Sequence, residues 1–380
     1  MNEIYNNIEY IYAILLILVF VFMMCRTENR FERLLEFPKK YYFGKESLII
    51  GENILKSELR KFCDKLDSDY NFIVSLSGGV DSMVTLALLY SIVSKDKIVT
   101  ASVNYNQRNE STEEINFLKD YLKTYDIKNY SVTVNVGKRK SGNIKRKVFE
   151  ETSQKIRYEL YRDIIRKNKW THDKTIILLG HHNDDLIENI FNNFMSGRSL
   201  TDLEVMRDLV VKDKLIFGRP FLKYPKSVIY DVSHNNKIPY FKDTTPNWSK
   251  RGLMRRKLFP LLKKIYPNLV NSLKKQGEVS SDLNVLISSN FVNDFITGIK
   301  EEDLGDKIVL SWSNKLNSSS KIVWKERLSK MLHSRGIGMI SSKSIDIFIE
   351  RENCKKYNIL SKYVSFKRTK DETFLSIKKK

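Results

Sequence analysis

The sequence predicts an α/β fold in which a doubly wound parallel sheet precedes a smaller, mostly helical carboxyl-terminal region. Three observations lead to this class. Short apolar runs rich in β-branched residues alternate with amphipathic helical segments between residues 45 and 180. A glycine-rich loop, Ser77–Ser82, joins the first run to a helix, and a polar cluster, His181–Asn189, follows the fourth run. Strands that alternate with helices form a parallel sheet covered on both faces.

The elements follow in order along the chain. A polar helix with Leu55, Leu59 and Phe62 on one side leads into the first strand. The four strands are expected at Asn71–Leu76, Lys97–Asn104, Tyr130–Val136 and Thr175–Gly180. The helices after the first three strands are expected after the glycine loop, after a capping box formed by Ser111 and Glu114, and over Val148–Lys167.

The loop Ser77–Ser82 lies where the first strand ends. Its adjacent glycines tolerate positive φ, so backbone N–H groups can converge at the first turn of the next helix. Two serine hydroxyls and the helix dipole complete an anion cradle suited to pyrophosphate. Asp81 inside this cradle would repel phosphate unless a cation lay between them, which implies Mg²⁺. The alternative is an ordinary turn in which Asp81 and Ser82 cap the helix.

The cluster His181–Asn189 reads HHNDDLIEN and stands where the fourth strand ends. Ligands of such sheets bind outside the carboxyl ends of the strands, so this cluster should face the same crevice as the glycine loop. On a helix that starts near Asp184, Glu188 shares a face with Asp184 and is reachable from Asp185. Two interpretations stay open: a transition-metal site, or carboxylates that serve the phosphate chemistry of the loop, with its Mg²⁺ and a cationic substrate.

Composition indicates the kind of partner. The 66 Lys and Arg against 45 Asp and Glu leave a net charge of +21, which favours a polyanion such as nucleic acid over a small neutral substrate. An A/T-rich genome that inflates lysine is the alternative. The basic run Lys138–Lys147 is either a solvated loop or an RNA contact. Three distant cysteines offer neither a disulfide framework nor a paired-cysteine zinc site, which indicates a reducing compartment.

Three regions are expected: a hydrophobic segment and basic linker over 1–44, the catalytic domain over 45–265, and a carboxyl-terminal region over 266–380. The apolar stretch Tyr10–Cys25 is interpreted as a membrane tether, a removed organellar leader or a buried helix. The protein is accordingly expected in the cytoplasm, tethered or free, with an organelle such as a plastid as the alternative. The last region is expected to hold helices at Asn271–Asn290, Lys325–Arg335 and Lys343–Glu350 and a strand at Ile308–Leu310.

The loop resembles the SGGxDS loop of the ATP pyrophosphatase superfamily, the PP-loop enzymes. The string His181–Glu188 resembles the HHxDDxxE motif of the tRNA(Ile)-lysidine synthetase family. Five further motifs of that family match in the same order: Val103-Asn104 with Arg108, Glu150-Glu151 with Arg157-Tyr158, Arg219–Leu222 with Lys226, Ile238–Tyr240 with Asp243 and Asn247, and Arg251 with Arg255 and Leu258–Leu262. The resemblance covers roughly residues 70 to 270.

Some positions depart from the family pattern. Tyr105 stands in place of His, Gln154 in place of the first Arg of RxxRY, Gly252 in place of Asn and Arg256 in place of His. The spacing from Asp243 to Asn247 is one residue longer than usual. These departures bear on substrate detail more than on adenylation.

The resemblance implies an ATP-dependent ligase that joins lysine to C2 of cytidine 34 in the CAU anticodon of tRNA(Ile) through an adenylated cytidine. It implies ATP and Mg²⁺ as cofactors, with tRNA(Ile) and free lysine as substrates; a homodimer is the one protein partnership considered. The ATP-binding residues are then Ser77, Gly78, Gly79, Val80, Asp81 and Ser82, with Asp81 at the metal. Asp81, Arg157, His181, Asp185 and Arg251 are expected to be catalytic, and Asn104, Arg108, His182, Asp184, Glu188 and Arg255 to contact substrate.

Three alternative functions come from two classes of protein, related enzymes and binding proteins without activity. A tRNA thiolase has a similar HHxDD string but normally carries paired cysteines, which this sequence lacks. Amidotransferase relatives lack both the HHxDD cluster and the strong basicity. A catalytically inactive tRNA-binding relative is the third alternative, and the intact loop and cluster argue against it.

Overall fold

The computed structural model describes residues 51–66, 69–106, 111–134, 146–203, 206–241, 250–318, 320–338, 340–352 and 354–379. The predicted apolar stretch Tyr10–Cys25, the basic run up to residue 145, Arg108, Asp243 and Asn247 lie outside these residues. A search of the described helices for one long and apolar enough to cross a membrane found none.

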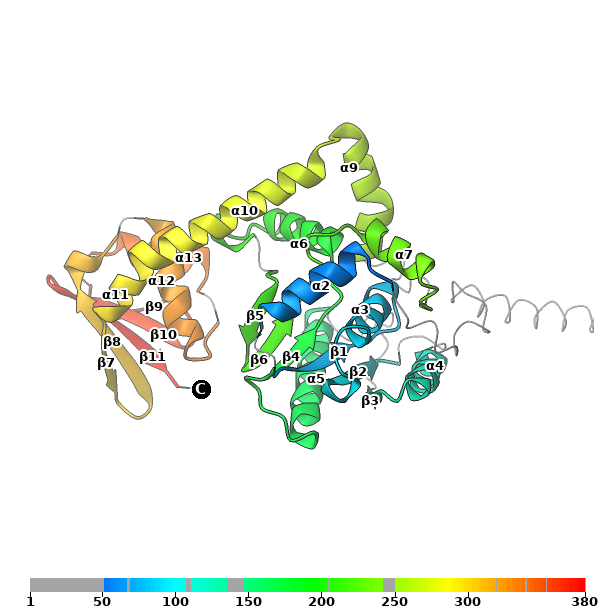
Figure 1. The fold of residues 1–380 in the computed structure, drawn as a ribbon. Helices are drawn as coiled ribbons and strands as arrows, with labels where there is room; N and C mark the ends of the chain where they lie inside the picture. Colours follow the sequence, from blue (N-terminus) through cyan, green and yellow to red (C-terminus); the bar gives the residue numbers. More distant parts are fainter. Residues whose placement is uncertain are drawn as a thin grey trace, which may run out of the picture. The chain divides into compact units, whose positions relative to one another are not determined.

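The first part of the chain builds a six-stranded sheet in the order β3-β2-β1-β4-β6-β5 (Figure 1). The strands are β1 Asn71–Ser75, β2 Ile98–Asn104, β3 Lys128–Thr133, β4 Thr175–Leu178, β5 Leu209–Lys212 and β6 Leu215–Gly218. All pair in parallel except the edge strand β5, which runs antiparallel to β6. The chain moves from β1 outward through β2 and β3, then returns to the other side of β1 as β4. The predicted doubly wound sheet is confirmed.

Helices cover both faces of this sheet: α2 Ile54–Asp64, α3 Val80–Tyr90, α4 Ser111–Thr124 and α7 Lys226–Asn235 on one face, and α5 Arg146–Lys167 on the other. Helices α6 Asn183–Met195, α8 Lys250–Leu253 and α9 Phe259–Ile265 also belong to this part of the chain. Alternate residues of β1 point to opposite faces: Phe72 and Val74 pack with α2, α3, α4 and α7, while Ile73 packs with Tyr161 and Ile164 of α5. The three central residues of the strand are therefore all apolar, because both of its faces are buried there.

The chain divides into two compact units. One runs to Glu188 and resumes from Met206 to Pro267, and the other comprises Asn189–Val205 and Asn268–Lys380. The division at Pro267 lies close to the boundary expected at residue 265. The sequence did not predict that Asn189–Val205 belongs to the second unit. Helix α6 is continuous across the first division, because it begins at Asn183 and ends at Met195.

The second unit holds helices and a five-stranded antiparallel sheet. The helices are α10 Leu269–Ile287, α11 Asp294–Thr297, α12 Lys321–His333 and α13 Ser342–Glu350. The strands, in the order β7-β8-β11-β10-β9, are β7 Lys300–Asp303, β8 Lys307–Ser313, β9 Cys354–Ile359, β10 Val364–Arg368 and β11 Glu372–Lys378. The predicted helices and the strand at Ile308–Leu310 are present, and four further strands join them. Trp312, Trp324, Phe348 and Phe366 form the centre of its core.

Candidate active site at the carboxyl edge of the parallel sheet

The loop after β1 has the conformation that its glycines were expected to allow. Gly78 has φ +79°, and a Cβ there would lie 2.5 Å from the ring of Phe241. The backbone N–H of Phe241 donates to the Gly78 carbonyl at 2.8 Å. No residue other than glycine fits this position without displacing Phe241.

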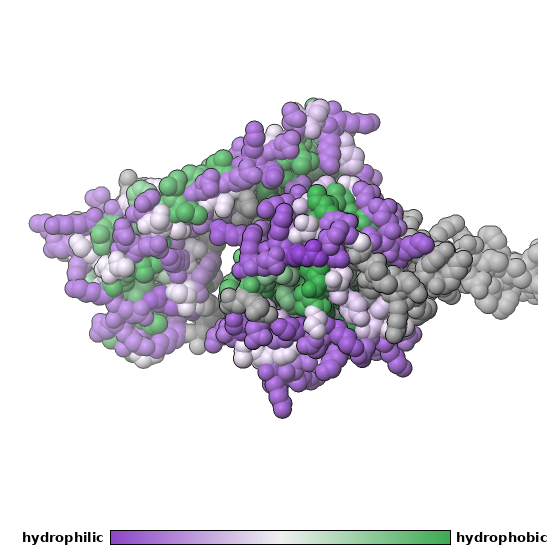
Figure 2. All heavy atoms as spheres, viewed as in Figure 1, coloured by the Kyte–Doolittle hydropathy of each residue, from purple (hydrophilic) through white to green (hydrophobic). Residues whose placement is uncertain are grey.

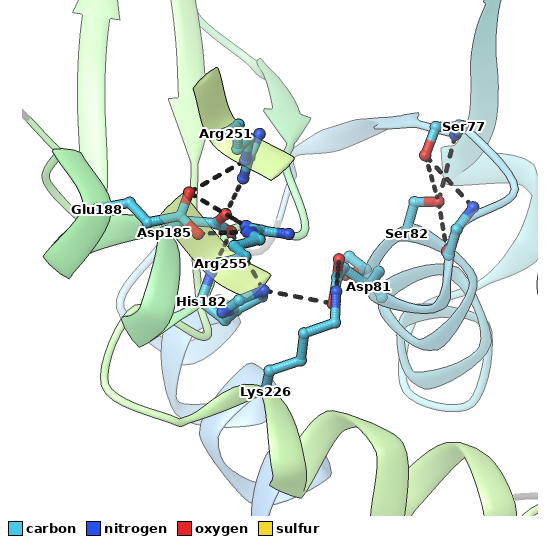
Figure 3. A network of polar contacts seen from close by, with 11 residues as sticks. Ser77, Asp81, Ser82, His182, Asp185, Glu188, Lys226, Arg251 and Arg255 are labelled. Atoms are coloured by element: carbon cyan, nitrogen blue, oxygen red, sulfur yellow. Dashed lines mark hydrogen bonds and ion pairs between the residues drawn. The ribbon is translucent and has the colours of Figure 1, made fainter. Parts of the chain in front are cut away.

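Two hydroxyl groups hold the loop in shape. Ser82 Oγ donates to the Gly79 carbonyl at 3.0 Å and accepts from the Ser77 N–H at 3.2 Å. Ser77 Oγ lies 3.3 Å from Ser82 Oγ (Figure 3). Helix α3 begins at Val80, and its N-cap residue, Gly79, offers no side chain to the first turn. The positive end of the helix is thus presented to an anion, and these residues fit the phosphates of ATP.

Asp81 connects the loop to the rest of the site. Its Oδ2 accepts from Lys226 Nζ at 3.1 Å, and its Oδ1 lies 3.6 Å from His182 Nε2. Within the described residues Oδ1 is buried and has no hydrogen-bond donor. A carboxylate oxygen of this kind is a ligand that Mg²⁺ prefers, so the residue fits the predicted ion. The described residues contain no group of three or more His, Cys, Asp and Glu arranged to hold a metal.

His182 lies between two carboxylates (Figure 3). Its side chain is fully buried, with Nε2 3.3 Å from Asp185 Oδ2 and 3.6 Å from Asp81 Oδ1. The His182 backbone N–H also donates to Asp185 Oδ2 at 3.2 Å. The close approach of β4 to α3 allows this arrangement: a Cβ on Gly180 would lie 2.7 Å from the carbonyl carbon and oxygen of Asp81. The two predicted clusters therefore meet through His182.

Two arginines neutralise the carboxylates of α6. Asp185 and Glu188 stand one turn apart, and Arg251 and Arg255 approach them from α8 and the π-helical turn Met254–Leu258. Arg255 Nη2 lies 2.7 Å from Asp185 Oδ1, and Arg251 Nε lies 3.1 Å from Glu188 Oε2. Arg251 also pairs with Asp185, and Arg255 with Glu188.

The same neighbours keep Asp185 ionised. Burial alone would raise the pKa of Asp185, but the electrostatic influence of His182, Arg251, His181 and Arg255 outweighs it and lowers the pKa to about 2. The carboxylate is thus fully charged at neutral pH.

His181, the other histidine of the pair, faces Arg219. The Nε of Arg219 donates to His181 Nδ1 at 3.1 Å. Burial lowers the pKa of His181 to about 4, with Asp185 opposing the shift and the charges of Arg219 and Arg251 adding to it. His181 is therefore neutral at physiological pH.

The remaining candidates lie around this centre. Asn104 ends β2 and is buried, with its Oδ1 accepting from the Asn106 N–H at 2.8 Å. Arg157 of α5 donates to the Tyr105 hydroxyl at 2.9 Å, and Gln154 donates to the Tyr158 hydroxyl at 3.0 Å. Asp184 lies in the first turn of α6. Two positions that depart from the family motifs, Tyr105 and Gln154, are thus hydrogen-bonded to residues that keep the motif.

Sequence reasoning quoted Lys226 and Arg219 within motifs but gave neither a role. In the structure Lys226 neutralises Asp81 and Arg219 binds His181. A signal existed for Arg219, because it directly follows a strand, as do the glycine loop and the histidine pair. The signal for Lys226 was weaker. It is the first residue of α7, just after Pro225, where the helix dipole disfavours a cation, so a lysine there indicates another role.

The fold and this site together define a PP-loop protein. The PP-loop domain family matches residues 52–262, more than half of the chain, and the chain belongs to this family.

Within the family, the chain is similar to tRNA(Ile)-lysidine synthases, which confirms the family predicted from the motifs. The enzyme of that name from Enterococcus faecalis is 26% identical over 210 residues, covering 53% of this chain and 42% of the relative. The enzyme of that name from Thermotoga maritima is 25% identical over 308 residues, covering 75% of this chain and 69% of the relative. The chain thus spans less than half the length of the first of these relatives.

Among solved structures, the U34-tRNA thiolase NcsA from Methanococcus maripaludis is similar in fold, with a TM-score of 0.47 and 19% identity. The match covers 63% of this chain and 81% of the thiolase chain.

Proposed function

We propose that this protein ligates lysine to C2 of cytidine 34 in the CAU anticodon of tRNA(Ile), using ATP to activate the base. Its similarity to tRNA(Ile)-lysidine synthases supports the reaction class. The net charge of +21 supports a nucleic-acid substrate. The observation that carries the proposal is the meeting of the loop Ser77–Ser82 and the carboxylates of α6 at one sheet edge, through Asp81, His182 and Asp185.

The first step adenylates the base. O2 of cytidine attacks the α-phosphorus of ATP, an O–P bond forms, and the bond to the bridging oxygen breaks to release pyrophosphate. The loop Ser77–Ser82 would hold the phosphates, and Asp81 would hold Mg²⁺, which neutralises phosphate charge when bound. Lys226, 3.1 Å from Asp81, lies where it could also meet a phosphate oxygen. Arg157 and Arg251 are proposed to stabilise charge that builds on phosphate.

The second step uses a cationic substrate. The ε-ammonium group of lysine is proposed to give one proton to Asp185, so that the free amine attacks C2 and a C–N bond forms. The C2–O2 bond breaks, AMP leaves with that oxygen, and the new C–N nitrogen releases its second proton to solvent. Asp185 and Glu188 are proposed to bind the ammonium group, helped by Asp184 and His182. Because Arg251 and Arg255 already neutralise this pair, lysine would have to displace part of that contact, and Arg251, with a side chain 51% exposed, is the freer of the two.

Cytidine must leave the anticodon stack to reach the sheet edge, which a single-stranded loop permits. Asn104 and Arg108 are proposed to contact the base or its phosphates, and the second unit is proposed to bind the body of the tRNA.

The test is nucleoside analysis of a tRNA(Ile) transcript with a CAU anticodon after incubation with the full chain, ATP, Mg²⁺ and labelled lysine. Label is expected in one modified cytidine, with AMP and pyrophosphate released in equal amounts. A transcript with a CAC anticodon is the matched control and should stay unlabelled. Sulfur incorporated from a thiol donor would identify a thiolase, and tRNA binding without AMP release would identify an inactive relative; either result overturns the proposal.

A further inference from the structure

The contact between Arg219 and His181 fixes which ring nitrogen of the histidine carries its proton. A guanidinium group only donates hydrogen bonds, so His181 Nδ1, 3.1 Å from Arg219 Nε, is the acceptor. A neutral imidazole with Nδ1 as acceptor has its single proton on Nε2. The nitrogen left for a substrate is therefore a donor.

Both partners are held by the register of the sheet. His181 follows β4 and Arg219 follows β6, two strands that pair in parallel with Leu178 opposite Gly218. The Arg219 N–H donates to the Asp208 carbonyl at 2.8 Å, and its Nη1 donates to the Arg207 carbonyl at 3.0 Å. Arg219 is thus fixed at both ends, by its backbone N–H and by the Nη1 of its guanidinium group. Its Nε is directed at the imidazole of His181.

The charges around His181 favour the neutral ring. The groups that act on it are Arg219 after β6, Arg251 on α8, and His182 and Asp185 at the start of α6. Asp185 is the one negative group among them, and it is already bound to Arg251, Arg255 and His182. A second proton on His181 would turn an Nδ1–H toward the Arg219 N–H, so two donors would face each other.

We propose that His181 acts as a fixed, neutral hydrogen-bond donor toward a substrate oxygen that gains negative charge, and that Arg219 is its positioning residue. The identity of that oxygen, phosphoryl or cytosine, rests on the proposed function; the state of the imidazole does not. The sequence predicted only that His181 is catalytic, and this proposal gives it the role of a donor. A donor of this kind stabilises charge without the loss of its own proton.

The state of the imidazole is tested by long-range ¹H–¹⁵N correlation spectra of the full chain labelled at its five histidines, without substrate. The His181 signal is assigned from its loss in His181→Gln. We expect protonated Nε2 and unprotonated Nδ1, unchanged from about pH 5.5 to pH 8, because the ordinary histidine pKa of about 6.5 no longer applies. Protonation at Nδ1, or a titration inside that range, overturns the proposal.

Two variants test the role of Arg219. Arg219→Gln keeps a donor without the charge and should retain the tautomer. Arg219→Met keeps only the length of the side chain. His181 should then exchange between tautomers and titrate at a higher pH than in the parent chain. Folding of each is checked by circular dichroism, and identical spectra for both variants and the parent chain would remove the positioning role.

The donor role is tested by replacing His181 itself and measuring tRNA-dependent pyrophosphate release. Glutamine places its amide N–H near the position of Nε2, and asparagine places it near Nδ1. We expect His181→Gln to stay within about tenfold of the parent chain, while His181→Asn and His181→Ala fall by about a hundredfold, a usual loss for one such donor. Equal losses in all three would contradict the donor role. A chain with the expected spectra that labels no cytidine would instead contradict the proposed function.

Discussion

Asp81 is the residue through which the two halves of the site touch, so it offers the most direct test of the loop. We expect Asp81→Ala to abolish ATP–pyrophosphate exchange, because Lys226 and His182 lose their shared carboxylate and Mg²⁺ loses its proposed ligand. Binding of tRNA, measured by filter retention, should change little, since RNA contacts depend on basic surfaces elsewhere.

Asp231 on α7 supplies the control for this substitution, because it is exposed and outside the site. Asp231→Ala should leave exchange unchanged. Normal exchange in Asp81→Ala would remove the metal-binding role from this residue.

Asp185 tests the proposed ammonium site. Asp185→Asn keeps the size of the side chain and removes its charge, so lysine should bind far more weakly while the phosphate loop stays intact. We expect pyrophosphate release to survive in part and labelled lysine incorporation to fall by orders of magnitude, at about 1.4 kcal/mol per tenfold. The exposed pair of Asp163 and Arg166 on α5 gives a matched control, and Asp163→Asn should have no effect. Normal incorporation by Asp185→Asn would exclude this carboxylate from lysine binding.

The lowered pKa of Asp185 also predicts how stability depends on pH. A carboxyl whose pKa falls from 3.8 to about 2 on folding stabilises the folded state above pH 4 and loses that contribution as the pH falls toward 2. The free energy of unfolding of Asp185→Asn should therefore fall less steeply than that of the parent chain over this interval, as urea titrations would measure.

At the scale of elements, the end of β4 lies so close to the start of α3 that only glycine fits at position 180. A Cβ at Gly180 would lie 2.7 Å from the Asp81 backbone and 3.0 Å from the Ser82 nitrogen. Gly180→Ala should push the two elements apart, lowering stability by about 1–3 kcal/mol and weakening ATP–pyrophosphate exchange. Thermal unfolding and exchange measure the two effects.

Gly338 is the control for this prediction, because a Cβ there meets nothing within 4 Å. Gly338→Ala should be neutral in both measurements. If Gly180→Ala were equally neutral, the close approach of β4 and α3 would not matter to the loop.

The strands show which elements of the fold could be predicted from the sequence. Strands β1, β2 and β4 were predicted because both of their faces are buried, which leaves short runs rich in apolar and β-branched residues. The hairpin of β5 and β6 was missed because its turn residues, Asp213 and Lys214, both take positive φ without the glycine that usually marks such a turn. Strands β9 and β11 lack a clean apolar period, and β10 offers only Val364 and Phe366 in alternation.

Within the site, local spacing predicted the loop and the carboxylates of α6, since each set lies within one short segment. The arginine pairs could not be predicted in the same way. Arg251 and Arg255 are 66 and 70 residues from Asp185 in the sequence, and the motif that contains them says nothing of which charges they meet. The role of Arg219 needed the register of β4 and β6, which periodicity does not supply.

At the scale of the whole molecule, the net charge of +21 is the feature to test. Figure 2 shows a viewed face that is mostly hydrophilic, with apolar patches between. If the excess charge serves RNA binding, the logarithm of tRNA affinity should fall steeply and linearly with the logarithm of salt concentration, because neutralised phosphates release counterions. A titration from 50 to about 200 mM salt measures the slope. A flat response would mean that the charge only reflects composition, and circular dichroism across the series excludes a change in folding.

The division of α6 between the two units has a consequence for the order in which a nascent chain can fold. Residues Asn189–Val205 leave the ribosome before the first unit is complete, yet their partners come much later: Thr201 Oγ1 contacts Glu326 at 2.6 Å, and the Leu203 N–H donates to Ser280 at 3.0 Å. Domains tend to fold as units, amino-terminal first, during synthesis. Here Thr201 and Leu203 have to wait for Ser280 and Glu326, which are synthesised only after the last strand of the parallel sheet.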